Sequence, residues 1–596
     1  MRDAETILGI LRERGQRGQP LEDVYRQLFN PELYLRAYGK IAPNAGAMTP
    51  GVTDETADGM SQERIQAIIH ALRDERYVWK PARRVYIERQ NSTKKRPLGI
   101  PTWGDKLLQE VIRLLLDAYY EPQFSDRSHG FRPGRGCHTA LTAIRRTWQG
   151  TAWFIEGDIS RCFDSLDHTV LMSILAEKLH DNRFLRLMRH LLQAGYLEEW
   201  NYHATHSGTP QGGVVSPLLA NIYLDRLDQF VSTELLPVHN HGHRRADNPE
   251  YCRVRRQAER EERQGDRGVA LKLRKQSQRL PAVLLNDPGF RRLHYLRYAD
   301  DFLLGYVGTH HEAEEIKRQI GAFLQSELHL ELSDEKTLIT HGRTEAAKFL
   351  GYEIVVLQND CKHTANRRSV NGAIGLKVPR DVIEEKCRPY RQHGQPIHRV
   401  ERIHDTEFTL LYQYQQVYRG IVQYYQLAYN LHRLDKLKWI MEQSLTKTLA
   451  RKLQISVPKV YGRFGAQIKT KEGLYKVLQV TVERKEKKPL IARWGGIPLR
   501  WKKDAILDDQ PHKILWRRTE LLQRFLADEC ELCGSHEDVQ VHHIRALKDL
   551  QTKGRSEIPA WVTQMAERHR KTLVVCLACH LAIHRGEPTP GTKPKP

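Results

Sequence analysis

The stretch Tyr295-Leu-Arg-Tyr-Ala-Asp-Asp-Phe-Leu-Leu-Gly-Tyr306 decides the fold. Apolar and aromatic residues run up to Asp300-Asp301 and resume directly afterwards, which predicts a strand, a tight turn and a second strand. Two adjacent carboxylates repel each other, so a buried core suits them poorly. A solvated turn is one interpretation, because Asp is common in turns. The other interpretation is a binding site for divalent cations. Mg²⁺ prefers carboxylate and phosphate oxygens as ligands, and a pair of such ions can assist phosphoryl transfer.

An earlier stretch supplies a third carboxylate. Trp153-Phe-Ile-Glu-Gly-Asp-Ile-Ser-Arg-Cys-Phe-Asp164 predicts an apolar strand that ends at Asp158, where the side chain can share a cation with Asp300 and Asp301. A lone Asp after a strand is more often a cap or turn residue, so this prediction depends on the three carboxylates together. Phe163 is either a core aromatic or a ring that presses on the sugar of an incoming nucleotide.

The length and net charge of the chain favour a polyanionic partner. The chain has 596 residues, which implies several domains, and its 94 Lys and Arg against 72 Asp and Glu give a net charge of +22. A membrane surface is the other candidate, but no apolar run approaches the ~18 residues of a spanning helix. The beginning of the chain, Met1-Arg-Asp-Ala-Glu-Thr, lacks the apolar segment of a signal peptide, so secretion is not expected.

Three loops have compositions that suit phosphates or close backbone approach. A basic loop runs from Arg89 to Arg96, and Ser128-His-Gly-Phe-Arg-Pro-Gly-Arg-Gly136 combines glycines with two arginines for phosphate contacts. Gly208-Thr-Pro-Gln-Gly-Gly-Val-Val-Ser-Pro217 is glycine-rich but lacks the Gly-Lys-Ser/Thr of a Walker loop, so an NTPase loop is excluded.

Six motifs resemble those of group II intron reverse transcriptases, in the same order, over roughly residues 50 to 355. They are Arg96-Pro-Leu-Gly-Ile-Pro, Gly130-Phe-Arg-Pro-Gly-Arg, Asp158-Ile-x-x-Cys-Phe-Asp164, Pro210-Gln-Gly-x-x-x-Ser-Pro217, Tyr298-Ala-Asp-Asp301 and Phe349-Leu-Gly-Tyr352. The resemblance implies right-hand polymerase fingers and palm. It also implies the following roles: Asp158, Asp300 and Asp301 as ligands of two Mg²⁺ with help from the Ile159 backbone; Arg89, Arg96, Phe163 and Gln211 as nucleotide-binding residues; and Phe349, Leu350 and Gly351 as the primer-binding turn.

Two later regions are basic and aromatic. Residues 375–480 have helical periodicity and many tyrosines. The tyrosines could form the core of a helical bundle, or a helix face that contacts a nucleic-acid duplex, and both can hold on different faces of the helices. This region resembles the thumb and maturase domain X of the same proteins, which binds intron RNA. Residues 481–524 hold twelve Lys or Arg against six acidic residues, interleaved with Trp494, Trp501 and Trp516, and resemble the family's DNA-binding segment. Residues 239–281 form a basic insertion that is either merely solvated or in contact with RNA.

The end of the chain predicts a zinc module. Of nine cysteines, five are scattered and four form Cys530-x-x-Cys533 and Cys576-x-x-Cys579, a spacing typical of structural Zn²⁺ in a reducing compartment. A structural zinc gives no reason for Val541-His-His-Ile544 or for His580 and His584, which share one face of a helix. The histidines resemble those of HNH nucleases. The resemblance implies His543 as general base, and His542, His580 and His584 as ligands of a catalytic divalent ion, although the middle Asn of that pattern is not obvious.

The predicted protein is therefore a multidomain α+β chain. Residues 1–370 are assigned to reverse transcriptase fingers and palm, 371–480 to an α-helical thumb and maturase domain X, 481–525 to a small basic DNA-binding segment, 526–586 to a zinc-stabilised ββα-metal HNH endonuclease, and 587–596 to a disordered tail. By resemblance, it is an RNA-directed DNA polymerase, a splicing maturase and a nuclease that nicks target DNA for target-primed reverse transcription. The alternatives are a splicing-only RNA-binding maturase and a reverse transcriptase of a defence or diversity system. Three intact aspartates and four intact cysteines speak against the first.

The expected partners are group II intron RNA, double-stranded target DNA, a DNA primer and dNTPs, without a membrane. The expected cofactors are two Mg²⁺ in the polymerase, a four-Cys Zn²⁺, and a divalent ion at the HNH site. The expected compartment is the bacterial cytoplasm, with an organelle as the less favoured location.

Overall fold

A long central helix, α5 (Trp103–Tyr120), organises the N-terminal region. Thr102 caps it by accepting a hydrogen bond from Asp105, and most of its residues are buried. Around it pack α1 (Ala4–Gln16), α2 (Val24–Gln27), α3 (Pro31–Ile41), α4 (Gln62–Arg73), α8 (His168–Ala176) and α9 (Asn182–Gln193). The four-stranded fingers sheet has the order β3-β2-β5-β6, with β2 (Ala82–Glu88), β3 (Lys95–Ile100), β5 (Tyr196–Glu198) and β6 (Asn201–His203).

The computed structural model describes the chain except residues 1, 45, 89–94, 200, 206, 209–211, 285, 334, 360–361, 365–366, 369, 471–472, 485–486, 503–519, 551–558, 569, 588 and 590–596. Arg89 and Gln211, both predicted to bind the nucleotide, therefore lie outside the described residues, as do Trp516 and most of the expected tail. In the described part, no helix is both long and apolar enough to cross a membrane.

The palm is a second four-stranded sheet, and it confirms the predicted hairpin. Its order is β7-β8-β4-β9, with β4 (Trp153–Asp158), β7 (Arg292–Tyr298), β8 (Asp301–Val307) and β9 (Ile339–His341), all antiparallel to their neighbours. The two long helices that pack with it are α10 (Ser216–Phe230) and α14 (His310–Leu328), joined in the same core by the stacked rings of Phe230 and Phe323. Shorter helices nearby are α6 (Cys137–Thr147), α7 (Cys162–Ser165) and α11 (Leu236–His239), which follows a π-helical turn (Val231–Leu235).

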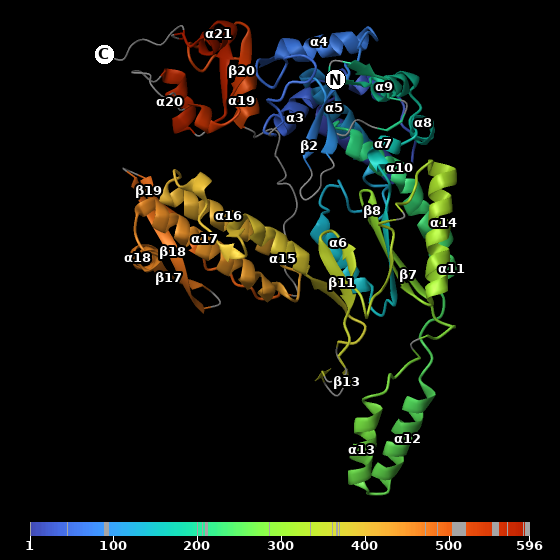
Figure 1. Ribbon diagram of the computed structural model, residues 1–596. Helices are drawn as coiled ribbons and strands as arrows, with labels where there is room; N and C mark the ends of the chain where they lie inside the picture. The colour runs from blue at the N-terminus through green and yellow to red at the C-terminus, as the bar shows by residue number, and fades with distance from the viewer. Residues whose placement is uncertain are drawn as a thin grey trace.

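The basic insertion is a helical hairpin that projects away from the palm (Figure 1). It consists of α12 (Pro249–Arg263) and α13 (Arg267–Ser277), packed through Val254, Ala258 and Ala270. Its two ends meet in an antiparallel bridge between Asp247 and Val283, so the hairpin leaves and rejoins the palm at one point.

The thumb joins the palm through the sheet β10-β11-β14, made of β10 (Ala347–Phe349), β11 (Tyr352–Val356) and β14 (Ile374–Lys377). Four helices follow: α15 (Arg380–Cys387), α16 (Glu407–Tyr424), α17 (Asp435–Leu453) and α18 (Val457–Phe464). Two-stranded ribbons join residues 363–364 to 367–368 and residues 391–392 to 395–396.

The expectation of helix up to residue 480 and of a boundary there is wrong. A three-stranded antiparallel sheet, β17 (Gly465–Thr470), β18 (Gly473–Arg484) and β19 (Lys487–Gly495), crosses that point and packs on α16. Leu478 and Trp494 belong to the thumb core, and the Trp494 indole N–H donates to Glu442 Oε2 (3.2 Å). Trp494 is thus unavailable to stack on a base, whereas Trp501 is exposed.

The last module is a ββα unit with β20 (Val539–His543), β21 (Thr572–Cys576) and α21 (Leu577–Arg585), together with α19 (Glu520–Leu526) and α20 (Ala560–Glu567). Its sheet has a third strand from the other end of the chain: β1 (Met60–Ser61) pairs with β20, with Met60 opposite Val541. Leu522, Phe525 and Val541 belong to the same core as the N-terminal helices. The module therefore lies against the N-terminal region, as Figure 1 shows.

Candidate functional site

The palm hairpin brings the three predicted aspartates together. Asp158 ends β4 and is paired directly with Asp301, the first residue of β8, so both side chains leave the same face of the sheet. Asp300 occupies the turn, where Ala299 has a φ of 58°. The backbone of Ile159, predicted to assist, continues from β4 and bridges to Leu332.

These carboxylates crowd one another electrostatically. Desolvation, followed by the charges of Asp300 and Asp158, raises the pKa of Asp301 to about 7. Desolvation, with the charge of Asp158, also raises the pKa of Asp300. Lys336 Nζ lies 2.8 Å from Asp158 Oδ2 and offsets part of the repulsion. A set of oxygen ligands that repel one another suits a hard divalent cation such as Mg²⁺.

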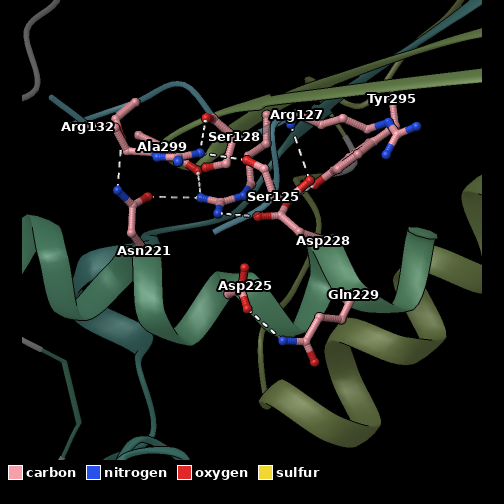
Figure 2. A network of polar contacts seen from close by, with 12 residues as sticks. Ser125, Arg127, Ser128, Arg132, Asn221, Asp225, Asp228, Gln229, Tyr295 and Ala299 are labelled. Atoms are coloured by element: carbon pink, nitrogen blue, oxygen red, sulfur yellow. Dashed lines mark hydrogen bonds and ion pairs between the residues drawn. The ribbon is translucent and has the colours of Figure 1, made fainter. Parts of the chain in front are cut away.

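A buried polar network holds the hairpin turn. The guanidinium of Arg297 forms a fully buried bidentate pair with Asp228 of α10, at 2.9 and 2.5 Å. Its third nitrogen donates to the Ala299 carbonyl (2.9 Å) and to Asn221 Oδ1 (3.1 Å), and Tyr295 Oη donates to Asp228 (2.7 Å). Figure 2 shows Asn221 and Asp228 reaching from one helix toward Ala299 and Tyr295. The turn is thereby fixed relative to α10.

The loop that contains Gly130 runs against the same turn. A Cβ on Gly130 would lie 2.3 Å from the Ala299 backbone nitrogen, so this close approach requires glycine. The expectation that its two arginines face phosphates is wrong for Arg132. Arg132 is buried on Glu121 and on the Ser125 and Ser128 carbonyls, and Arg135 pairs with Asp126. Both guanidiniums instead stabilise the loop itself.

Two further residues with predicted roles, Arg96 and Phe163, lie on β3 and α7. Arg96 is exposed on β3, and its charge opposes the rise in the pKa of Asp300, which places the guanidinium within electrostatic reach of the hairpin. Phe163 on α7 is half-buried with its ring edge against the exposed Phe131, with ring centroids 6.4 Å apart.

The predicted primer-binding turn is held by the thumb. Leu350 and Gly351 both have positive φ, 48° and 70°, and join β10 to β11. The hydroxyl of Tyr424 donates to the Leu350 carbonyl (2.7 Å), and that of Tyr425 donates to the Gly351 carbonyl (3.0 Å). The C-terminal end of α16 therefore fixes the turn that follows Phe349.

In the last module, the four cysteines converge. The Sγ atoms of Cys530, Cys533, Cys576 and Cys579 all lie within 4.8 Å of one another. Four thiolates at this spacing fit a tetrahedral structural Zn²⁺.

The three predicted HNH ligands also converge, and they meet a fourth residue. His542 comes from β20, and His580 and His584 come from α21. Asp58, which precedes β1, joins them, so that one ligand atom of each lies within 4.8 Å of the others. Imidazoles and a carboxylate are suitable donors for a divalent cation. Asp58 was not predicted, because nothing in its local sequence distinguishes it from the neighbouring acids Asp54 and Glu55.

The predicted general base, His543, points to the N-terminal region. Its Nε2 lies 2.7 Å from the hydroxyl of Tyr38 on α3, and the two rings meet edge to face. Burial lowers the pKa of His543 to about 4. The imidazole is consequently neutral at pH 7, as a base must be.

Three family descriptions match successive parts of the chain: reverse transcriptase (RNA-dependent DNA polymerase) at residues 87–354, type II intron maturase at 381–491, and AI2M/AI1M-like HNH endonuclease at 530–580. The group II intron-encoded protein LtrA of Lactococcus lactis subsp. cremoris is 37% identical over 584 residues, covering 94% of this chain and 96% of LtrA. This chain is a group II intron-encoded protein.

Fungal relatives extend the same family. An uncharacterized 91 kDa protein in the cob intron of Schizosaccharomyces pombe is 33% identical over 94% of this chain and 69% of its own length. The putative COX1/OXI3 intron 1 protein of Saccharomyces cerevisiae is 30% identical over 94% and 68%. This group II intron-encoded protein therefore combines reverse transcriptase, maturase and HNH endonuclease domains, as predicted.

Proposed function

We propose that Asp158, Asp300 and Asp301 bind the two Mg²⁺ of RNA-directed DNA synthesis. The observation that carries this proposal is the convergence of the three carboxylates at one end of strands β4 and β8, where burial, together with the charges of Asp300 and Asp158, raises the pKa of Asp301 to about 7. When bound, the ions activate the primer hydroxyl and neutralise the departing pyrophosphate. The chain's own contribution is to fix the carboxylates, through the Arg297 network, before substrate arrives.

The surrounding residues then position the substrates. Arg96, with Arg89, grips the triphosphate; Phe163 excludes a 2′-hydroxyl; and Gln211 lines the nucleotide pocket. Phe349, Leu350 and Gly351 support the primer end. The exposed position of Arg96 near Asp300 supports its role, and the thumb tyrosines that hold residues 350 and 351 support the primer role.

At the other site, His542, His580 and His584 bind a divalent ion, and neutral His543 accepts a proton from the attacking water. With the Nε2–H of His543 donating to the Tyr38 hydroxyl oxygen, Nδ1 has the lone pair that accepts the proton of the water. Tyr38 thus fulfils the orienting role that the missing middle Asn would have. Cys530, Cys533, Cys576 and Cys579 hold Zn²⁺ that maintains the module.

The partners follow from these activities. The intron RNA is bound by the maturase region and spliced with its help, and target DNA receives the RNA in one strand. The nuclease nicks the other strand, whose 3′-hydroxyl primes synthesis from dNTPs. The hairpin α12–α13 carries nine Lys or Arg against four Glu, which supports RNA phosphate contacts there.

The decisive experiment is sequencing of RNA that co-purifies with the protein in high salt, which suppresses non-specific phosphate contacts. One structured RNA that flanks the protein's own coding region is expected. Excision of residues 249–279, with a short turn joining the bridged ends, should reduce the salt dependence of RNA binding while cDNA synthesis on a simple template persists. A heterogeneous RNA population would instead point to a free-standing reverse transcriptase.

Two substitutions separate the activities. Asp300→Asn should abolish cDNA synthesis but leave RNA binding intact, and retained synthesis would remove Asp300 from the site. His543→Ala should abolish second-strand nicking but leave cDNA synthesis intact. His536→Ala, at an exposed histidine in the same module, is the matched control. Unaltered nicking by the His543 variant would refute its role as the base.

A further inference from the structure

Asp58 lies at the centre of the three HNH histidines although it is nearly 500 residues away in sequence. Its Oδ2 is 2.8 Å from His584 Nε2, and its Oδ1 is 3.1 Å from His580 Nε2 and 3.3 Å from His542 Nδ1. The Nε2 atoms of His580 and His584 are 3.1 Å apart. The Asp58 side chain is 15% exposed, whereas that of His584 is 51% exposed, so the cluster opens to solvent on the side of His584.

The backbone around Asp58 is built into the nuclease sheet. The His543 N–H donates to Asp58 Oδ1 (2.7 Å), and the Gly59 N–H donates to the Val541 carbonyl (3.0 Å). Gly59 has a φ of +69°, which turns the chain between Asp58 and strand β1. The carboxylate is therefore held in place by the same strand, β20, that supplies His542.

The tautomer of His580 leaves a lone pair directed at Asp58. Its Nδ1 lies 2.9 Å from Gln540 Oε1, an acceptor, so Nδ1 carries the proton and donates. In the neutral ring, Nε2 is then unprotonated and faces a carboxylate oxygen, which is also an acceptor. Two acceptors at this distance need a cation between them, either a second proton or a metal ion.

The position of His542 favours a metal ion. The residue is buried, with 4% of its surface exposed. Its Nδ1 lies 3.3 Å from Asp58 Oδ1 without hydrogen-bond geometry, and among the described residues its Nε2 has no hydrogen-bond partner. A buried ring nitrogen without a well-aligned partner is costly, and a metal ion between His542 Nδ1 and Asp58 Oδ1 would supply that partner. One divalent cation satisfies all three imidazoles and the carboxylate together.

We propose that Asp58 is a fourth protein ligand of the nuclease's divalent ion, so that the N-terminal region of the polymerase completes the metal site of the endonuclease. The proposal rests on the assignment of His542, His580 and His584 as ligands. On a six-coordinate ion, four protein ligands leave two positions for a water and the scissile phosphate, whereas a four-coordinate ion would be closed.

The test is a Co²⁺ titration of the full-length protein whose four-Cys site is already loaded with Zn²⁺, followed by visible absorption. Asp58→Asn should weaken Co²⁺ binding at least about tenfold and change the absorption bands, because a charged ligand is lost. The side-chain oxygen of Asn at position 58 can still accept a hydrogen bond from the His543 N–H, so the nuclease module should stay docked on the N-terminal region. Asp54→Asn, at an exposed carboxylate in the same loop, should bind as the unaltered protein does.

His580→Ala distinguishes the assignment of the three histidines as ligands from the assignment of Asp58. If Asp58→Asn binds Co²⁺ with unchanged affinity and bands while His580→Ala loses it, the histidine site stands and Asp58 is not a ligand. If His580→Ala also binds Co²⁺ unchanged, the assignment of the histidines itself is overturned. Hydrogen exchange at the Gly59 and His543 amides verifies that each variant remains docked.

Discussion

At the scale of single residues, the raised pKa of Asp301 predicts a pH-dependent metal requirement. A carboxylate must lose its proton to bind Mg²⁺, and in the metal-free protein Asp301 does so at about pH 7. The Kd for Mg²⁺ should therefore fall about tenfold per pH unit from about pH 5 to 7 and then level off. Calorimetric titration with Mg²⁺ at several pH values measures this. A plateau that already begins near pH 4 would contradict the shift.

The same shift has a consequence for folding. Because the folded protein binds the Asp301 proton more tightly than the unfolded chain does, the metal-free protein should lose stability as pH rises from about 4 to about 7. Asp300→Asn removes one charge next to Asp301, so the pH at which the Kd for Mg²⁺ levels off should be lower in this variant.

Arg297 predicts a large stability effect. Arg297→Met leaves Asp228 buried without its counter-ion, which should lower the free energy of unfolding of the palm by about 3–5 kcal/mol. Urea unfolding measures the change. The double variant Arg297→Met/Asp228→Leu should recover much of the loss, because no unpaired charge remains. Arg318→Met breaks an exposed pair with Glu315 and should change little; an equal effect of both single variants would refute the argument.

At the scale of elements, helix α16 controls the primer-binding turn through its last tyrosines. Tyr424→Phe/Tyr425→Phe removes the two hydroxyls that donate to the carbonyls of Leu350 and Gly351. Each lost hydrogen bond should lower the free energy of unfolding by about 0.5–1.5 kcal/mol. Primer extension should become less processive and need more primer–template. Tyr412→Phe, at an exposed tyrosine of the same helix, is the control. If both variants extend primers equally well, the turn does not depend on the thumb.

Local patterns predicted the elements that carry their own signal. The palm hairpin, the strand that ends at Asp158 and the helix with His580 and His584 were all predictable, because periodicity and turn residues are local. Trp494 was misread, since a basic, aromatic segment looks the same whether its indole packs on α16 or faces solvent. Arg297 and Asp228 were missed because the sequence does not show which distant charges become partners in a core.

At the scale of the whole molecule, the nuclease module docks through an aromatic contact. Phe525 is fully buried and meets Tyr38, so Phe525→Ala should weaken the packing by about 3–5 kcal/mol. Amide exchange at Gly59 and His543 should then accelerate, while cDNA synthesis persists. Leu526→Ala, at the exposed neighbouring position, should leave exchange unchanged. Protected amides in the Phe525 variant would show that docking depends on other contacts.

The pairing of Met60 with Val541 also has a meaning for synthesis of the protein. A ribosome makes the first strand of that sheet several hundred residues before its two partners. Premature termination therefore yields a chain with the polymerase and without the module that cuts DNA. The nuclease sheet can therefore be completed only after the polymerase domains have been synthesised.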